Sequence, residues 1–354
     1  MTKAAELAKM GEVLTNSQIG GRRNLLYNPK FEVAQRGTSF SGGTSALYGL
    51  DRWHIANGNS FDFNVTVSQS TTVPSGQGFK HSLKVEADVA DTPTGSENGA
   101  IQQKLEAQDV QQLMYGTSDA KTLTLSFWVR SNKTGTYCVQ FMTNQGNSTV
   151  GNRYVHVKEY TINSADTWEK KIMVLTGHTA QAFDGNDDSD GLRVTWHLVT
   201  GADDKTATAD TWTQSPSFLT TSNQVNFMDS ADNEWYLCGC QLEVGSYPND
   251  TPFEHRSFGD ELLLCQRYYC KITDVSANHR LSGTSTSTHH IAHYSFPVTM
   301  RTTPTASELT APTVLNCGSL TPSMSTDNVA FRVNPSGIGA YYAKTYVYDF
   351  TSEL

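Results

Sequence analysis

Short runs in which apolar and polar residues alternate constrain the fold of this chain more than any other feature. In residues 123–130, LTLSFWVR, every second residue is apolar, and residues 136–142 (TYCVQFM) and 192–200 (LRVTWHLVT) repeat the alternation. A period of two places the apolar side chains on one face of a half-buried strand. Polar turn clusters such as SNKTG and DGNDDSDG separate these runs. Many antiparallel strands joined by polar turns predict an all-β protein, a jelly-roll β-sandwich, over residues 22–257.

Two segments carry the apolar spacing of a helix instead. Leu7, Met10 and Leu14 recur at helical spacing, which predicts a short N-terminal helix within residues 1–21. A helix of this length is marginal alone in water, so we expect it to fold against a partner, and a frayed terminus is the alternative. Residues 101–116 (IQQKLEAQDVQQLMYG) predict a helical interruption that covers one end of the sandwich.

The junction after the last predicted strand of the sandwich changes from strand to turn to helix. Ser257 and Asp260 fit a capping pattern at the start of a helix over residues 258–270. Helical spacing then places four side chains on one apolar face, namely Phe258, Leu262, Cys265 and Tyr269. We expect this helix to couple the sandwich to the part of the chain that follows.

Residues 271–354 predict a small C-terminal β domain. Strand patterns occur in residues 290–300 (HIAHYSFPVTM), 328–334 (NVAFRVN) and 340–350 (AYYAKTYVYDF), after a polar stretch rich in Ser and Thr. Fewer than 100 residues give an isolated β domain a small core. Association with further copies of the chain would stabilise it, which favours an oligomer.

Charge and hydropathy exclude several partners. The formal net charge is -9 and no basic cluster is larger than the pair Arg22–Arg23, so a phosphate backbone would be repelled and nucleic-acid binding is not expected. No apolar run reaches the roughly 20 residues that cross a bilayer, so membrane insertion is not expected either. The N-terminus lacks a secretory signal pattern, and we expect a soluble protein made in the cytoplasm with its six cysteines as free thiols.

No sequence pattern of a known catalytic centre is present. The nucleophile elbow, the zinc-protease helix, the phosphate loop and the dinucleotide fingerprint are all missing. Carboxylates are scattered, so a glycosidase pair of acids remains open, although nothing designates a particular pair. We therefore expect a protein without enzymatic activity.

The acidic turn at residues 184–191 is a candidate metal site. Carboxylate and amide oxygens at alternating positions suit Ca²⁺. The spacing differs from that of an EF-hand loop, because Ser189 stands where its glycine would be. A solvated acidic loop without metal is the alternative reading. The candidate ligands are Asp184, Asn186, Asp188 and Asp190.

Residues 51–53 combine a charge pair with a large aromatic side chain. We expect the indole of Trp53 in the core, and Arg52 paired with Asp51 or another nearby carboxylate. A role for Trp53 as a platform on which a sugar stacks is the functional alternative.

Several stretches together resemble tail-fibre and related virion proteins of tailed bacteriophages, over roughly residues 20–270. The resemblance implies a jelly roll like that of carbohydrate-binding modules, and FPVTMRTTPT (296–305) resembles the first strand of the short β domain that often follows. The stretches are GGRRNLLYNPKFEVAQRGTSF (20–40), LDRWHI (50–55), LTLSFWVRSNKTGTY (123–137), TWEKKIMVLTG (167–177) and CGCQLEVGSYPNDTPFEHRSFGDELLLCQRYY (238–269).

The resemblance implies a non-enzymatic virion protein, most simply a homotrimeric tail fibre or receptor-binding protein. Residues 1–21 would then attach it to other virion proteins, the jelly roll would form the body, and the C-terminal β domain would be the distal part that faces the host and its surface polysaccharide. A structural subunit without a receptor, such as a capsid decoration protein, a head fibre or a tail adaptor, is the alternative. A chain of 354 residues is short for a complete long fibre, which favours that alternative.

The tyrosines near the C-terminus are the candidate glycan contacts. Tyr341 and Tyr342 lie in the run AYYAKTYVYDF, which reads as one strand, with Tyr342, Tyr346 and Tyr348 on one face and Tyr341 on the other. Tyrosine rings can stack on sugar C–H groups while their hydroxyls hydrogen-bond. The alternative is that all of them are structural.

Overall fold

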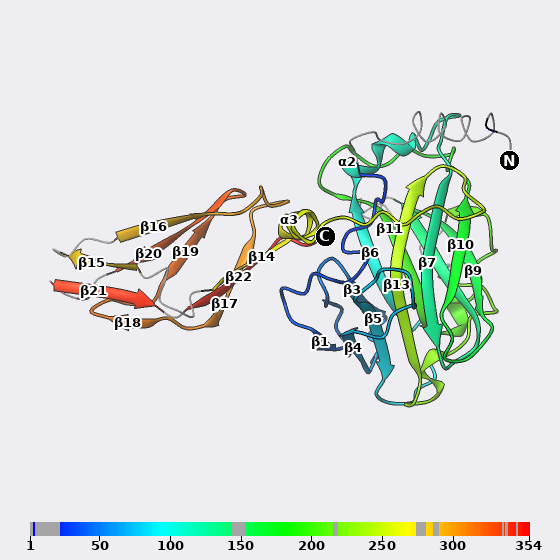
Figure 1. The fold of residues 1–354 in the computed structure, drawn as a ribbon, viewed down its shortest axis with the longest axis horizontal. Helices are drawn as coiled ribbons and strands as arrows, with labels where there is room; N and C mark the ends of the chain where they lie inside the picture. The colour runs from blue at the N-terminus through cyan, green and yellow to red at the C-terminus, as the bar shows by residue number, and fades with distance from the viewer. Residues whose placement is uncertain are drawn as a thin grey trace. The chain divides into compact units, whose positions relative to one another are not determined.

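The chain forms two compact units in the computed structural model (Figure 1). One unit runs to Arg256 and includes Leu354, and the other runs from Ser257 to Glu353. The predicted N-terminal helix lies outside the described residues. The structure describes residues 3, 22–143, 153–214, 219–273, 281–285, 290–334, 336, 339–344 and 346–354.

The first unit is an antiparallel β-sandwich of two sheets. Its six-stranded sheet has the order β1-β4-β5-β13-β7-β10 among the described residues. The bounds are β1 Ser39–Ser41, β4 Val65–Ser70, β5 Ser82–Ala87, β13 Glu234–Val244, β7 Leu123–Ser131 and β10 Glu169–Leu175.

The seven-stranded sheet of the described chain has the order β12-β9-β8-β11-β6-β3-β2. The chain crosses repeatedly between the two sheets, as in a jelly roll, while the pairs β2–β3, β4–β5 and β8–β9 are neighbours within one sheet. The bounds are β12 Trp212–Gln214, β9 Tyr154–Ile162, β8 Gly135–Thr143, β11 Asp190–Thr200, β6 Asn98–Glu106, β3 His54–Gly58 and β2 Leu47–Tyr48.

The core of the sandwich consists of the apolar side chains that the alternation designates. Leu125, Phe127 and Val129 of β7 are fully buried, and so are Val194 and Trp196 of β11. The ring of Phe127 meets that of Trp196 edge to face, with centroids 5.7 Å apart, and so joins the two sheets. The predicted all-β sandwich is confirmed.

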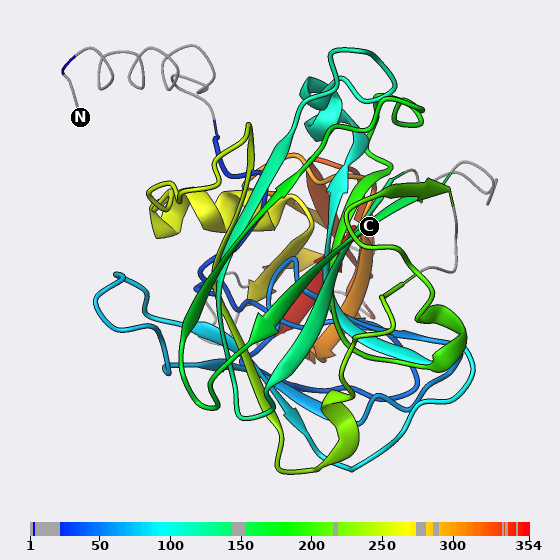
Figure 2. The same ribbon diagram turned by 90° about the vertical axis from the view of Figure 1, so that its right-hand side faces the viewer.

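The predicted helix at residues 101–116 is mostly wrong. Residues 98–106 form β6, which pairs with β11 along its whole length. Only α2 (Ala107–Val110) and the 3-10 turn η1 (Gln111–Leu113) are helical, at one end of the sandwich in both views (Figure 1, Figure 2). Pairing inside a large sheet overrides the helix-forming glutamines of this segment.

The described residues contain three further short helical or 3-10 segments. They are η3 Ala202–Asp204 and η4 Phe227–Asp229 in the first unit, and α3 Phe258–Gln266 in the second. No helix among the described residues is both long and apolar enough to cross a membrane.

The second unit contains three small antiparallel sheets among its described residues. Their orders are β14-β22-β17, β15-β21-β18 and β16-β20-β19. The bounds are β14 Tyr269–Thr273, β15 Leu281–Ser285, β16 His290–Ser295, β17 Thr305–Thr310, β18 Thr313–Leu315, β19 Thr321–Met324, β20 Asn328–Val333, β21 Gly339–Lys344 and β22 Val347–Thr351.

The predicted helix at 258–270 begins where expected and ends early. The Ser257 hydroxyl accepts from the Asp260 amide at 3.2 Å and donates to the Asp260 carboxylate at 2.6 Å, so the capping pattern is confirmed. The helix ends at Gln266, because Tyr269 enters β14 and pairs with Thr351. The predicted apolar face is therefore incomplete.

Burial along α3 differs from the predicted face as well. Cys265 is buried and Leu262 is half-buried, but Phe258 is 54 % exposed. Glu261, on the other hand, is buried. The capping pattern locates the start of the helix, whereas the identity of its buried face depends on packing that spacing alone does not specify.

Candidate functional site

A groove of about 470 Å³ lies on the outer face of the seven-stranded sheet, away from the sandwich core. Strands β3, β6, β8 and β11 form its floor, and the segment after β11 forms one wall. Its lining is mostly polar. Side chains that line it include Asn98, Gln102, Gln140, Met142, Arg193, Thr195, His197, Asp204 and Leu219.

The floor residues face outward because of the strand register. Thr195 of β11 stands directly opposite Gln140 of β8 on one side and Gln102 of β6 on the other. Directly opposite residues of antiparallel strands share a face, and their neighbours Val194 and Trp196 point into the core. The polar alternate positions therefore form a row across three strands.

This row continues onto β3 through His54. The amide nitrogen of Gln102 lies 2.6 Å from Nδ1 of His54, and the hydroxyl of Thr195 donates to the amide oxygen of Gln102 at 3.4 Å. Burial and, to a smaller extent, the positive charges of Lys104 and Arg193 together lower the pKa of His54 to about 3. His54 is therefore neutral, and the polar row carries no charge there.

His197 is the most unusual residue of the groove. Its side chain is 2 % exposed, and neither ring nitrogen has a hydrogen-bond partner among the described residues. Burial lowers its pKa to about 3, so the ring is neutral at physiological pH. A neutral imidazole has one donor and one acceptor, and leaving both unused in the interior costs free energy.

The wall beside His197 is tied to the sheet by hydrogen bonds. The carbonyl of Asp204 accepts from the amides of Leu219 and Thr220, each at 3.1 Å. The side chain of Gln224 accepts from the Cys138 amide at 2.8 Å and donates to the His197 carbonyl at 3.2 Å. These contacts hold the wall against β8 and β11.

Two charged residues of the lining each have an acidic neighbour. Burial and the neighbouring Asp203 raise the pKa of Asp204. Arg193 lies with its Nε 2.5 Å from a carboxylate oxygen of Asp190. The groove therefore favours a neutral ligand that offers many hydroxyl groups over a strongly charged one.

The residues of the predicted calcium site differ in burial and in their contacts. Asp190 begins β11 and pairs with Arg193, while Asn186 is exposed and Asp184 and Asp188 are half-buried. Asp187 accepts from the Ser189 amide at 3.0 Å, as in a solvated turn. No group of three His, Cys, Asp or Glu side chains within the described residues is arranged to hold a metal. Calcium binding here stays a prediction.

Residues 51–53 lie inside the sandwich. The indole of Trp53 is 1 % exposed and donates to the Asn28 carbonyl at 3.0 Å, so it has no exposed face for a sugar. Asp51 accepts from the Gln35 amide at 2.7 Å. Arg52 is buried with a positive φ of 69° and donates to the Lys104 carbonyl at 2.6 Å. These residues stabilise the fold and are not part of the groove.

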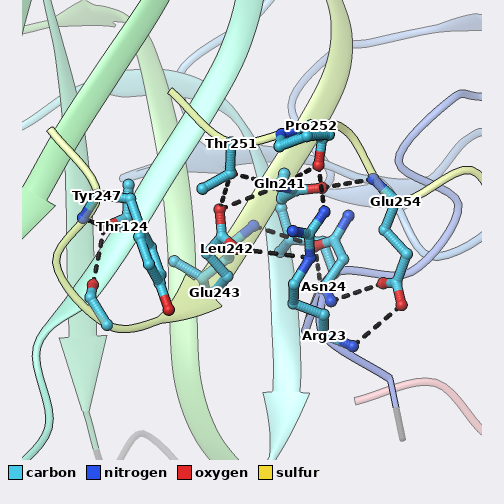
Figure 3. A network of polar contacts seen from close by, with 12 residues as sticks. Arg23, Asn24, Thr124, Gln241, Leu242, Glu243, Tyr247, Thr251, Pro252 and Glu254 are labelled. Carbon is cyan, nitrogen blue, oxygen red and sulfur yellow. Dashed lines mark hydrogen bonds and ion pairs between the residues drawn. The ribbon is translucent and has the colours of Figure 1, made fainter. Parts of the chain in front are cut away.

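The closing segment after β13, residues 245–256, is fastened by the polar network drawn in Figure 3. Gln241 donates to the Pro252 carbonyl at 3.3 Å and accepts from the Glu254 amide at 2.7 Å. Glu254 accepts in turn from the amides of Arg23 and Asn24, at 3.1 and 2.7 Å. The distinctive QLEVGSYPNDTPFEH motif therefore fastens the end of the sandwich to its beginning, which is a structural role.

The C-terminal tyrosines do not lie on one strand, so that prediction is wrong. The run divides into β21 and β22, which belong to different sheets, and Tyr346 lies between them. Tyr341, Tyr346 and Tyr348 all enter the core of the second unit, because the break interrupts the alternation. Tyr341 is 5 % exposed and offers little ring face to a ligand. Tyr342 is half-buried, and its role as a glycan contact stays a prediction.

Sequence reasoning missed the residues of the groove. The alternation that identified β8 and β11 also places Gln140, Thr195 and His197 on the outer face. Their polarity alone indicates only that they face solvent, not that they form a site. A row across strands became visible only with the register of three non-consecutive strands, which the sequence does not specify.

No protein-family model matches the sequence, and no curated protein matches it. Among solved structures, 64 chains match. One is the enzymatically active domain of tailspike protein 4 from bacteriophage CBA120, with 12% identity over 62% of this chain and 21% of that chain, at a TM-score of 0.33. This chain thus corresponds to about a fifth of that tailspike chain.

Two further matches cover most of the length of the other chain. One is a protein from Bacteroides thetaiotaomicron described as sugar-binding, with 13% identity, 63% of this chain, 100% of that chain and a TM-score of 0.37. The other is a xylan-binding domain from Paenibacillus barcinonensis, with 14% identity, 55% of this chain, 93% of that chain and a TM-score of 0.32. Likenesses at this level carry no information about the ligand of this chain.

Proposed function

We propose that this protein binds carbohydrate without catalysing a reaction, and that the groove over β3, β6, β8 and β11 is the binding site. The observation that carries the proposal is the row of polar side chains across β6, β8 and β11, in which the amides of Gln102 and Gln140 flank the hydroxyl of Thr195 on the floor of the groove. Sugar hydroxyls both donate and accept, so they match these amides and this hydroxyl.

The acids of the groove favour binding over hydrolysis. Glycoside hydrolysis generally needs two carboxyl groups on either side of the scissile bond. Asp204 is the one carboxylate among the described residues that line the groove. The proposal therefore assigns this site recognition alone.

At the level of biology, we propose a virion protein of a tailed bacteriophage, in which the sandwich binds a host surface polysaccharide. The motif resemblance over residues 20–270 supports this assignment, and a homotrimer would multiply a weak single site by avidity. Attachment to the particle would use residues 1–21. A capsid decoration, head-fibre or tail-adaptor role remains the alternative, and immunogold labelling of particles distinguishes tail from head.

An array of bacterial capsular and O-antigen polysaccharides tests binding directly. We expect the purified protein to bind a small subset of the polysaccharides. Thr195→Val keeps the shape of the side chain and removes its hydroxyl, so it should weaken that binding about tenfold if the hydroxyl contacts sugar. Gln140→Leu should weaken it at least as much, because the amide group on the floor of the groove is lost.

Thr161→Val is the matched control. Thr161 lies on β9 of the same sheet, is exposed and does not line the groove. Its substitution should leave array binding unchanged. Equal binding by all three variants and the parent would show that the groove is not the site, and absence of binding to every polysaccharide would contradict the proposed function.

A further inference from the structure

A second hollow lies on the opposite side of the sandwich, on the outer face of the six-stranded sheet. It measures about 330 Å³, near the lower end of the range for ligand pockets. The closing segment at Asp250–His255 and the loop at Gln77–Phe79 border it, and Trp128 and Lys170 form its floor. It shares no lining residue with the groove. We call it the aromatic cleft.

The floor of the aromatic cleft is set by strand register and by a bulge. Trp128 of β7 stands directly opposite Lys170 of β10 and Cys238 of β13. The register shifts immediately after Cys238, where Gly239 has a φ of +58°. A Cβ at Gly239 would lie 2.4 Å from the ring of Phe79, so the missing side chain leaves room for that ring against the sheet.

Three aromatic rings form one side of the aromatic cleft. Phe79 meets Phe253 edge to face with centroids 5.0 Å apart, and His255 lies 5.5 Å from Phe79 and 4.9 Å from Phe253. Burial lowers the pKa of His255, and the charge of Lys30 lowers it further. The side formed by these rings is therefore apolar and uncharged at neutral pH.

Trp128 differs from these rings because it has no comparable contacts. Among the described residues, its indole nitrogen makes no hydrogen bond and its ring contacts no other aromatic ring or cation. It is half-buried in the floor, so part of the ring faces the cleft. Lys170 and Asp250 form an ion pair beside it, which leaves the rim polar but without net charge.

We infer that the aromatic cleft is a second carbohydrate site, which takes one neutral hexopyranose ring stacked on Trp128. The C–H face of a pyranose matches an exposed indole face, while its hydroxyls suit the ammonium and carboxylate of the rim. The balanced ion pair disfavours an anionic sugar. The inference rests on the proposed function only for the class of ligand, since the two sites have separate residues.

Two sites on opposite faces would change how the protein binds a polymer. One chain could then engage two strands of a polysaccharide, or two repeats, so the second binding event would be intramolecular. Loss of either site should therefore reduce binding to a polysaccharide surface more than binding to a short oligosaccharide.

Saturation-transfer NMR on the full-length protein tests the inference. The probes are methyl β-D-glucopyranoside and methyl β-D-galactopyranoside, each in large excess. We expect transfer to the ring C–H protons of at least one of them, concentrated on one face of the ring. Trp128→Ala should reduce that signal strongly, whereas Trp128→Phe should retain more of it because a smaller aromatic platform remains.

Trp168→Ala is the matched control, since Trp168 is a half-buried tryptophan of the same unit that contacts Tyr236 and does not line the cleft. It should keep the full signal. Lys170→Met leaves Trp128 in place and removes the ammonium group of the rim, so it should reduce the signal. It tests the cleft even if Trp128→Ala fails to fold. No transfer to either probe, or an unchanged signal in both the Trp128→Ala and Lys170→Met variants, would overturn the inference.

Discussion

Asn24 shows how one buried side chain can join distant parts of the chain. Its amide oxygen accepts from the backbone amides of Leu26 and Leu242, at 3.1 and 3.0 Å, and its amide nitrogen donates to the Cys240 carbonyl at 2.9 Å. The side chain is fully buried. It therefore links the first residues of the sandwich to its last strand, a role that its position in a turn-prone sequence did not reveal.

Asn24→Ala should destabilise the sandwich by about 2 kcal/mol or more, because buried backbone groups lose their partners. Chemical denaturation followed by fluorescence measures this. Asn163→Ala is the control, since Asn163 is exposed and donates to Glu169 at 2.8 Å, and it should change stability by less than about 0.5 kcal/mol. Equal effects of the two substitutions would contradict the structural role of Asn24.

The buried histidines make stability depend on pH. His197 has a folded-state pKa of about 3 and His156 of about 4, in both cases chiefly through burial, against an ordinary value of 6.5. Between pH 6.5 and these values the unfolded chain binds protons that the folded chain does not. The free energy of unfolding is therefore highest above pH 6.5 and falls as the pH drops through this window.

His197→Gln should show a smaller loss of stability between pH 7.5 and pH 5 than the parent. The difference should be at most about 2 kcal/mol, which is the 1.5-unit gap between pH 5 and 6.5 expressed as free energy. Denaturation curves at the two pH values measure it, and each protein serves as its own reference. An identical pH-dependent loss in the variant and the parent would show that His197 is protonated in the folded state.

At the scale of elements, strands were predictable where one face is buried and ambiguous elsewhere. Residues 123–130 and 192–200 carry a period of two because only one face meets the core. Residues 101–106 lie in the middle of a sheet and carry polar side chains on the groove face, so their pattern resembles a helix. The break between β21 and β22 was invisible because both strands bring tyrosines into the same core.

The bulge in β13 is the element on which the aromatic cleft depends. Gly239→Ala would place a methyl group against Phe79 and hold a non-glycine residue at positive φ. Gly76→Ala is a matched control, since Gly76 also has a positive φ, of 74°, but no atom lies within 4 Å of its Cβ position. We expect Gly239→Ala to lower the melting temperature more than Gly76→Ala, and equal shifts would mean that the contact with Phe79 is not tight.

At the scale of the whole molecule, the second unit leaves apolar side chains exposed on short strands. Leu309 of β17 and the adjacent Val314 and Leu315 of β18 are 39% to 50% exposed. Ile291 of β16 is 52% exposed. Small sheets with exposed apolar residues gain stability from association. This distribution is consistent with the proposed trimer, and we expect its contacts to lie in the second unit.

Light scattering tests the oligomer. The full-length protein should have three times the mass of one chain, and a chain that ends at Arg256 should be a monomer. Leu315→Ser should weaken the trimer, because it removes an apolar contact between copies. A monomeric full-length protein would contradict the proposal, and so would a shortened chain that is just as trimeric.

The central claim is that the groove on the seven-stranded sheet holds carbohydrate, and oxidative footprinting tests it most directly. Met142 lines the groove, whereas Met114 lies outside it and is exposed. Hydroxyl-radical oxidation is read by mass spectrometry with and without a polysaccharide selected on the array. We expect bound polysaccharide to slow oxidation of Met142 severalfold and to leave Met114 unchanged. Unchanged oxidation of Met142, with protection confined to Tyr342 or other residues of the second unit, would contradict the account.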